Sequence, residues 1–266
     1  MNNIISTLLT RMDSGALAGT DVIPWSCPVP SFGDVDSSRV ATLGLNPSNR
    51  EFVDETGEEL DGTARRFHTL KSLGIERWSE AKPRHLRLIG ESCRGYFLRN
   101  PYDAWFRRLD GIIAGTSASY YSSSAKACHL DLIPFATACK WTGLSRRARA
   151  ALVACAGDSL GLLLRDSPIQ LLVLNGESVV SSFEDIAGVR LQERAVPEWS
   201  LPRRSRPAVM GFAYQGSVRK LAKIKLKREV MVLGFNHNIQ SSFGVTSHVI
   251  AAIRNWIGSA TKRLLA

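Results

Sequence analysis

Three polar side chains within or just after short apolar runs are the best candidates for chemistry in this chain. Asn46 lies in the segment Gly-Leu-Asn-Pro-Ser (44–48), where a glycine and a proline make a rigid turn that presents the amide. Asp131 lies in the run 128–133, and His237 follows the run 230–235. An amide can orient water but is a poor base, and an ionised carboxylate only accepts hydrogen bonds. Asn-Pro is also a common loop opener, so the weight of Asn46 depends on the surrounding elements.

Four short, nearly continuous apolar runs predict the strands that position these residues, at 39–45, 128–133, 169–174 and 230–235. Between them lie segments with helical periodicity, at 63–73, 83–95, 102–113, 145–165 and 246–265, the last with Thr246 or Ser247 as N-cap. This alternation predicts an α/β fold, a three-layer α/β/α sandwich around a central, mostly parallel four-stranded sheet. Functional groups of such sheets gather where the strands end, so we expect Asn46, Asp131 and His237 to cluster there.

The chain is strongly basic. Its 266 residues carry 34 Lys and Arg against 24 Asp and Glu, a formal net charge of +10, and are expected to form one domain, 1–266. Nine of the cations and no acid lie between Leu201 and Arg228, within a segment (187–228) that we expect to be an irregular basic insertion, with a hairpin over 187–215 as the alternative. A field of this sign attracts nucleic acid, and a solvated basic loop is the alternative explanation.

With these elements assigned, the sequence resembles the uracil-DNA glycosylase superfamily over roughly residues 20–260. Its members carry a Gly-x-Asn-Pro type of turn after the first strand, a base-reading residue after the second and a histidine-containing loop after the last. The order and location match Asn46, Asp131 and His237. The resemblance implies a hydrolase that flips a base out of DNA and cuts its N-glycosidic bond. Asn46 would hold the attacking water, Asp131 would read the base and His237 would stabilise the leaving base.

The resemblance also implies contacts with DNA and with the flipped base. Ser241 and Ser242 would bind phosphates, Phe243 would wedge into the gap in the stack, and Phe52 would stack on the flipped base. Cations of the basic segment would bind the DNA backbone, namely Arg219, Lys220 and Lys223. The alternatives are a loop histidine that caps backbone groups at His237, and core positions for Phe52 and Phe243.

Asp131 departs from the family pattern, in which the base-reading residue is usually Asn. An Asn can donate to uracil O4 and accept from N3–H, whereas an ionised Asp only accepts and would favour an exocyclic amine such as cytosine N4. This difference argues for a modified cytosine over uracil, for example the glucosylated hydroxymethylcytosine of phage DNA. The role would then be antiviral defence, with base-excision repair as the alternative.

The five cysteines, at 27, 93, 128, 139 and 155, are expected to be reduced thiols of a cytoplasmic protein, because no secretory leader or membrane-spanning run is seen. Some branches of the superfamily hold a four-cysteine iron–sulfur cluster, and Cys27, Cys139 and Cys155 match part of its spacing. The early Cys-x-x-Cys pair is broken at Pro24, and Cys93 or Cys128 would have to substitute. We therefore expect no cofactor, and a monomer that has DNA as its partner and no membrane contact.

A basic α/β module that binds nucleic acid without chemistry is the main alternative function. A nucleotide-handling enzyme is less well supported, since no glycine-rich phosphate loop follows any predicted strand. The histidines show no metal-ligand spacing, and no serine or cysteine lies in a nucleophile elbow.

Overall fold

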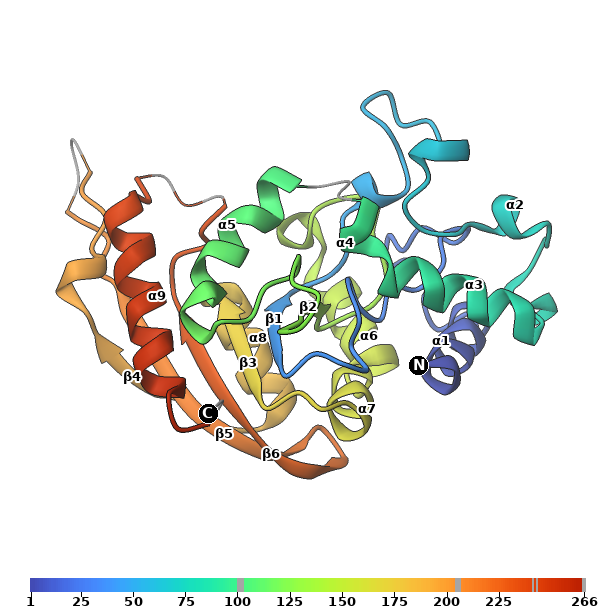
Figure 1. Ribbon diagram of the computed structural model, residues 1–266. Helices are drawn as coiled ribbons and strands as arrows, with labels where there is room; N and C mark the ends of the chain where they lie inside the picture. Colours follow the sequence, from blue (N-terminus) through green and yellow to red (C-terminus); the bar gives the residue numbers. More distant parts are fainter. Residues whose placement is uncertain (100–102, 204–206, 241, 243, 265–266) are drawn as a thin grey trace.

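The computed structural model describes residues 1–99, 103–203, 207–240, 242 and 244–264, and its centre is a mixed six-stranded sheet. The strand order is β2-β1-β3-β6-β5-β4 (Figure 1). Four strands run parallel to one another, namely β1 (Val40–Gly44), β2 (Ala127–Asp131), β3 (Leu171–Asn175) and β6 (Ile224–Phe235). These four strands are the four predicted apolar runs, and the predicted α/β class is confirmed.

The prediction of a four-stranded sheet was wrong, because two antiparallel strands extend it. β5 (Phe212–Leu221) pairs with β6, and β4 (Gln192–Ala195) pairs with β5 at the edge. Both lie within the segment 187–228, where paired strands, including the hairpin of β5 with β6, take the place of an irregular insertion. Every residue of β4 is exposed and β5 mixes buried with exposed positions, so neither has the continuous apolar run of a strand covered on both faces.

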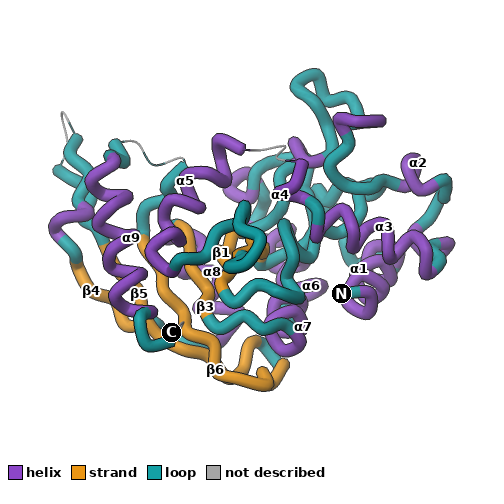
Figure 2. Tube along the Cα trace, in the orientation of Figure 1, coloured by secondary structure: helices purple, strands orange, loops and turns teal. Residues whose placement is uncertain are grey.

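Helices cover both faces of the sheet (Figures 1 and 2). One hydrophobic cluster contains side chains of α3 (Pro83–Arg94), α5 (Asp103–Ile113) and α9 (Ser247–Thr261). The other contains side chains of α6 (Arg146–Ala156), α7 (Ser159–Asp166) and α8 (Glu177–Ala187). Successive strand residues point to opposite faces, so Val173 of β3 belongs to the first cluster and Leu172 to the second.

The remaining helices are short or lie at the margin of the sheet. They are α1 (Asn2–Asp13), α2 (Leu70–Leu73) and α4 (Tyr96–Arg99). Single 3-10 turns occur at η1 (Asn49–Glu51), η2 (Gly62–Ala64), η3 (Trp78–Glu80), η4 (Ala114–Thr116), η5 (Trp141–Gly143) and η6 (Pro197–Trp199). In the part of the chain that the structure describes, no helix has the length and apolar character needed to cross a membrane.

Helix boundaries agree with the sequence where a capping residue marks them. Thr246 caps α9, because its side chain accepts a hydrogen bond from the backbone nitrogen of Val249. The single helix expected over 145–165 is instead two, α6 and α7, separated at Gly157 and Asp158. Of the segment 63–73, only the last four residues are α-helical.

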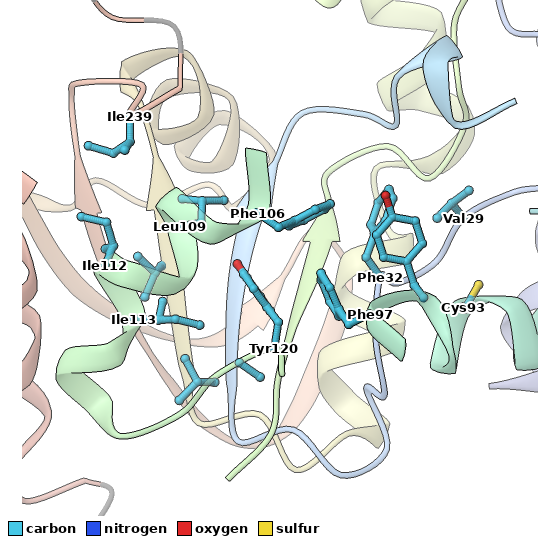
Figure 3. Close-up of a cluster of buried hydrophobic side chains, with 14 of the residues drawn as sticks. Val29, Phe32, Cys93, Phe97, Phe106, Leu109, Ile112, Ile113, Tyr120 and Ile239 are labelled. Carbon is cyan, nitrogen blue, oxygen red and sulfur yellow. The ribbon is translucent and has the colours of Figure 1, made fainter. Parts of the chain in front are cut away.

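Aromatic rings fill the space between α4, α5 and the parallel strands (Figure 3). The ring of Phe32 lies edge-on to Tyr96 with centroids 4.9 Å apart, and Phe97 stacks on Tyr120 at 4.6 Å. Each such pair stabilises the fold by about 0.5–1.5 kcal/mol beyond its burial. Phe106 of α5 joins the same cluster and carries it to the sheet edge where β1 and β2 end.

Candidate active site

A cavity of about 520 Å³ lies at the carboxyl ends of the parallel strands. Its walls include Gly44 from β1, Asp131 from β2, Asn175 from β3 and Asn238 from the loop after β6. This volume is within the range of about 300–1,000 Å³ that is usual for small-molecule sites. Asn46 also lines the cavity, so the structure brings together two of the three residues that the sequence analysis singled out, Asn46 and Asp131.

The side chain of Asn46 is held in one orientation. Its amide nitrogen donates to Thr137 Oγ1 at 2.9 Å and to the carbonyl oxygen of Pro47 at 3.1 Å. Thr137 in turn donates to the carbonyl oxygen of Cys139 at 2.7 Å, so its hydroxyl is fixed as an acceptor for Asn46. Among the described residues nothing donates to Asn46 Oδ1. With its nitrogen engaged by the protein, Asn46 offers a fixed acceptor to a water molecule or ligand in the cavity.

Asp131 and His129 reach the cavity from the same face of β2, two residues apart. Asp131 Oδ1 lies 3.5 Å from His129 Nε2, and both side chains are buried. The other ring nitrogen of His129 is hydrogen-bonded to Thr42 Oγ1 at 2.7 Å, and Thr42 also bonds the Tyr120 hydroxyl. The ring of His129 is therefore fixed beside the Asp131 carboxyl.

Gly44 leaves the space that the Asp131 carboxyl occupies. A Cβ atom at residue 44 would lie 2.3 Å from Asp131 Oδ1 and 2.9 Å from His129 Nε2. The glycine is thus required by close approach of two side chains, and it explains the first residue of the Gly-Leu-Asn-Pro-Ser segment.

Gly44→Ala is expected to lower the free energy of unfolding by about 1–3 kcal/mol, because Asp131 and His129 must be displaced within a packed site. Urea denaturation measures the change. Gly111→Ala in α5 is the matched control, since a Cβ there meets nothing within 4 Å and a helical alanine is favoured. Equal stability of the two variants would show that Asp131 does not occupy the space beside Gly44.

Glu51 is a cavity residue that the sequence analysis missed. It ends the 3-10 turn η1 and is 4% exposed. The Tyr96 hydroxyl lies 3.0 Å from both of its carboxylate oxygens, and Arg66 Nη1 lies 3.7 Å from Oε2. Burial raises the pKa of Glu51 to about 7; the negative charge of Asp131 adds to this effect, whereas Arg66 and Tyr96 oppose it. The group can therefore hold or release a proton near neutral pH.

Aromatic rings form the apolar walls of the cavity, and they too were missed. The lining includes Phe32, Trp105, Phe106 and Trp141. The ring of Trp105 lies edge-on to His129 with centroids 5.4 Å apart, and Phe106 does so at the same separation. A cavity lined by both aromatic rings and polar groups suits a planar ligand that carries hydrogen-bonding edges.

His237 does not line the cavity, in contrast to its predicted catalytic position. Its side chain is 2% exposed, and Nε2 donates to the carbonyl oxygen of Trp199 at 2.7 Å. Burial lowers the pKa of His237, and the bond to Trp199 opposes the change. The next residue, Asn238, faces the cavity instead. The loop is tied to β3 by Asn175, which accepts from the Ile239 nitrogen and donates to Gln240 Oε1.

The residues predicted to stack on the base or bind phosphate are distributed differently. Phe52 is a core residue, 1% exposed and packed against Phe67 and Trp25, so it does not line the cavity. Ser242 lies in the loop after β6, where its backbone nitrogen donates to the carbonyl oxygen of Asn238 at 2.8 Å. Ser241 and Phe243 lie outside the described residues.

The cations Arg219, Lys220 and Lys223 lie at the tip of the β5–β6 hairpin. Because β6 is parallel to β1 and β3, its first residue lies at the sheet edge opposite to the cavity, roughly 35 Å away along the strand. Arg219 pairs with Glu229 at 3.0 Å. Lys140 is an exposed cation that does line the cavity.

The cysteines are distributed over the molecule. Cys27, Cys93 and Cys128 are buried, Cys155 is half-buried and Cys139 is exposed at the cavity. Burial raises the pKa of the three buried thiols. In the described ranges no three His, Cys, Asp or Glu side chains gather as a metal site, and Cys27, Cys139 and Cys155 do not form one.

One signal in the sequence could have identified His129. Residues two apart on a strand share a face, so a site that contains Asp131 is also expected to contain His129. No comparable signal marks Glu51, Trp105 or Trp141, which reach the cavity from irregular segments and a helix. A comparison with protein-family models and with curated protein sequences finds no match, so the function must be inferred from the geometry of this site.

Proposed function

We propose that the protein is a DNA glycosylase that hydrolyses the N-glycosidic bond of a flipped-out pyrimidine and leaves an abasic site. The base would be uracil or a modified cytosine such as glucosylated hydroxymethylcytosine. One observation carries the proposal: a single cavity contains the fixed acceptor Asn46 Oδ1, the Asp131 carboxyl and aromatic walls. Enzymes that act on a base must take it out of the duplex and hold it between apolar groups while its edge is read.

The proposed reaction develops positive charge on the sugar and negative charge on the base. Asn46 would orient the attacking water through Oδ1, but an amide is a poor base and removes little of the barrier by proton abstraction. Most of the rate must then come from stabilising the departing base. Asp131, which lies beside His129, would accept from an exocyclic amine of that base. His129 is the imidazole available in the cavity, in place of His237.

DNA as the partner is supported by the formal net charge of +10. Lys140 at the cavity would meet the phosphates near the flipped nucleotide. The hairpin cations at the opposite edge would contribute long-range attraction more than direct contact with that nucleotide. The protein would act as a cytoplasmic monomer, in antiviral defence or in repair.

Base release from a panel of DNAs tests the proposal. The panel contains uracil, thymine mismatches, hydroxymethylcytosine and glucosylated hydroxymethylcytosine, and alkaline cleavage detects abasic sites. Asn46→Ala is expected to slow release roughly 100-fold or more, because the water loses its fixed acceptor. Asn255→Ala, on an exposed position of α9, is the matched control and should release bases at the unaltered rate.

Two results would contradict the glycosylase. One is the absence of release from every DNA in the panel, together with tight, salt-dependent DNA binding, which would favour a binding module. The other is equal release by Asn46→Ala and Asn255→Ala, which would remove Asn46 from the chemistry.

A further inference from the structure

Two carboxyl groups from different parts of the chain reach the same cavity. Asp131 comes from the end of β2 and Glu51 from η1, which follows the turn that contains Asn46. Both side chains are at least nine-tenths buried. Asp131 entered the proposed function as a base-reading group, whereas Glu51 has no role in it.

The surroundings of Glu51 are built to hold a carboxyl group in a defined place. The charged and titratable groups that face it are Arg66, Tyr96 of α4 and Asp131. The Tyr96 hydroxyl contacts both carboxyl oxygens of Glu51. Arg66 Nη1 lies 3.7 Å from Oε2, so its positive charge offsets the cost of burying an ionised Glu51 only in part. Burial, and to a smaller extent the nearby charge of Asp131, favour the protonated form of Glu51. With a pKa of about 7, Glu51 carries its proton below neutral pH.

We propose that Glu51, as a carboxylic acid, and Asp131, as a carboxylate, together read the Watson–Crick edge of a cytosine-type base, and that Glu51 protonates this base as it leaves. Asp131 accepts from the exocyclic amine, and Glu51 donates to the ring nitrogen N3. This inference rests on the proposed glycosylase function and narrows its substrate class.

The donor and acceptor pattern selects cytosine over uracil. Cytosine offers an amine donor and the N3 acceptor, so a carboxylate beside a carboxylic acid complements it. Uracil offers the O4 acceptor and an N3–H donor. The Asp131 carboxylate would then face another acceptor, and the O–H of Glu51 would face another donor. A substituent on carbon 5 leaves the Watson–Crick edge of cytosine unchanged. The same two groups would therefore also recognise cytosines that are modified at this carbon.

The proton also serves the chemistry. As the bond between sugar C1′ and base N1 breaks, its electron pair goes to the base, and the proton of Glu51 moves to N3, so the base leaves neutral. The water held at Asn46 forms the new bond to C1′ and releases one proton to solvent. Solvent then reprotonates Glu51. In the net reaction the sugar gains the hydroxyl group of one water molecule and the base gains a hydrogen. A buried carboxylic acid kept neutral near pH 7 is a recognised proton donor.

Single-turnover base release between pH 5.5 and 8.5 tests this assignment. The probes are three DNAs of one sequence, with hydroxymethylcytosine, its glucosylated form or uracil at one position. The unaltered protein is expected to release a cytosine-type base, with a rate that falls about tenfold per pH unit above about pH 7. Glu51→Gln is expected to bind the same DNA equally well, because its amide still donates to N3. It should release the base roughly 100-fold more slowly and show no alkaline decline.

Two further variants separate this role from a structural one. Glu55→Gln, an exposed neighbour in the same segment, is expected to keep the rate and the pH profile. Tyr96→Phe removes a hydrogen bond that favours the ionised form of Glu51, so the alkaline decline should move to higher pH.

The possible results distinguish this inference from the glycosylase itself. A Glu51→Gln rate and profile like those of the unaltered protein, or a decline that Tyr96→Phe does not move, overturns the role of Glu51 and leaves the glycosylase. Release of uracil alone overturns the cytosine selection, again with the glycosylase intact. No release of any base removes both.

Discussion

Asp131→Asn is expected to shift base preference from cytosine-type bases toward uracil by about 10- to 100-fold. One well-placed pair of hydrogen bonds to a base edge discriminates by about 1–3 kcal/mol, which corresponds to this range. The substituted amide can donate to uracil O4, which the carboxylate cannot. Its shape matches that of the aspartate, so the contact with Gly44 is preserved.

Competitive base release from an equal mixture of uracil and hydroxymethylcytosine DNA measures this shift. Asp36→Asn is the matched control, since Asp36 is exposed and precedes β1 at the opposite edge of the sheet. An unchanged ratio of the two released bases would mean that Asp131 does not contact the base edge.

Glu51→Gln is expected to remove a large pH dependence of stability. The pKa of Glu51 is raised by burial from 4.5 in the unfolded chain to about 7 in the folded protein. A raised pKa means that the folded state binds the proton more tightly, so this stabilisation is complete below about pH 4.5. It is lost as the pH rises to about 7. Relative to Glu51→Gln, the unaltered protein should lose about 3 kcal/mol of unfolding free energy between pH 4.5 and pH 8.

Urea denaturation of both proteins across this pH range measures the difference. The glutamine keeps an oxygen that accepts from Tyr96, and Arg66 keeps its bond to the carbonyl oxygen of Arg50 at 2.9 Å, so little else should change. A difference between the two proteins that stays constant with pH would show that Glu51 ionises as freely when folded as when unfolded.

The central strands were predictable because a strand that is buried on both faces consists largely of apolar residues. Runs such as 169–174 are largely apolar on both faces, and this pattern identified the four parallel strands and hence the edge where Asn46 and Asp131 meet. β4 is exposed at every residue and carries no such pattern. Its place at the sheet edge depends on backbone pairing with β5, which side-chain composition does not encode.

The site was predictable only where a strand fixes the direction of a side chain. The regular alternation of β2 sets Asp131 and His129 on one face, whereas no periodicity continues past Phe235 to decide between His237 and Asn238. The structure decides through Trp199, whose carbonyl oxygen binds the His237 ring. The pKa of Glu51 is raised by burial in the folded protein, a change opposed by Arg66 and Tyr96, which lie further along the chain, so the residue type alone could not reveal it.

The order of the strands determines when the cavity is completed during synthesis of the chain. β6 follows the other five strands of the sheet along the chain, in the part that the structure describes, yet it lies inside the sheet between β3 and β5. Until the ribosome has released the residues through Asn238, β3 has an unpaired edge and the cavity lacks one wall. A nascent chain that lacks β6 therefore has an incomplete cavity. The proposed activity on DNA would be withheld until β6 has paired with β3.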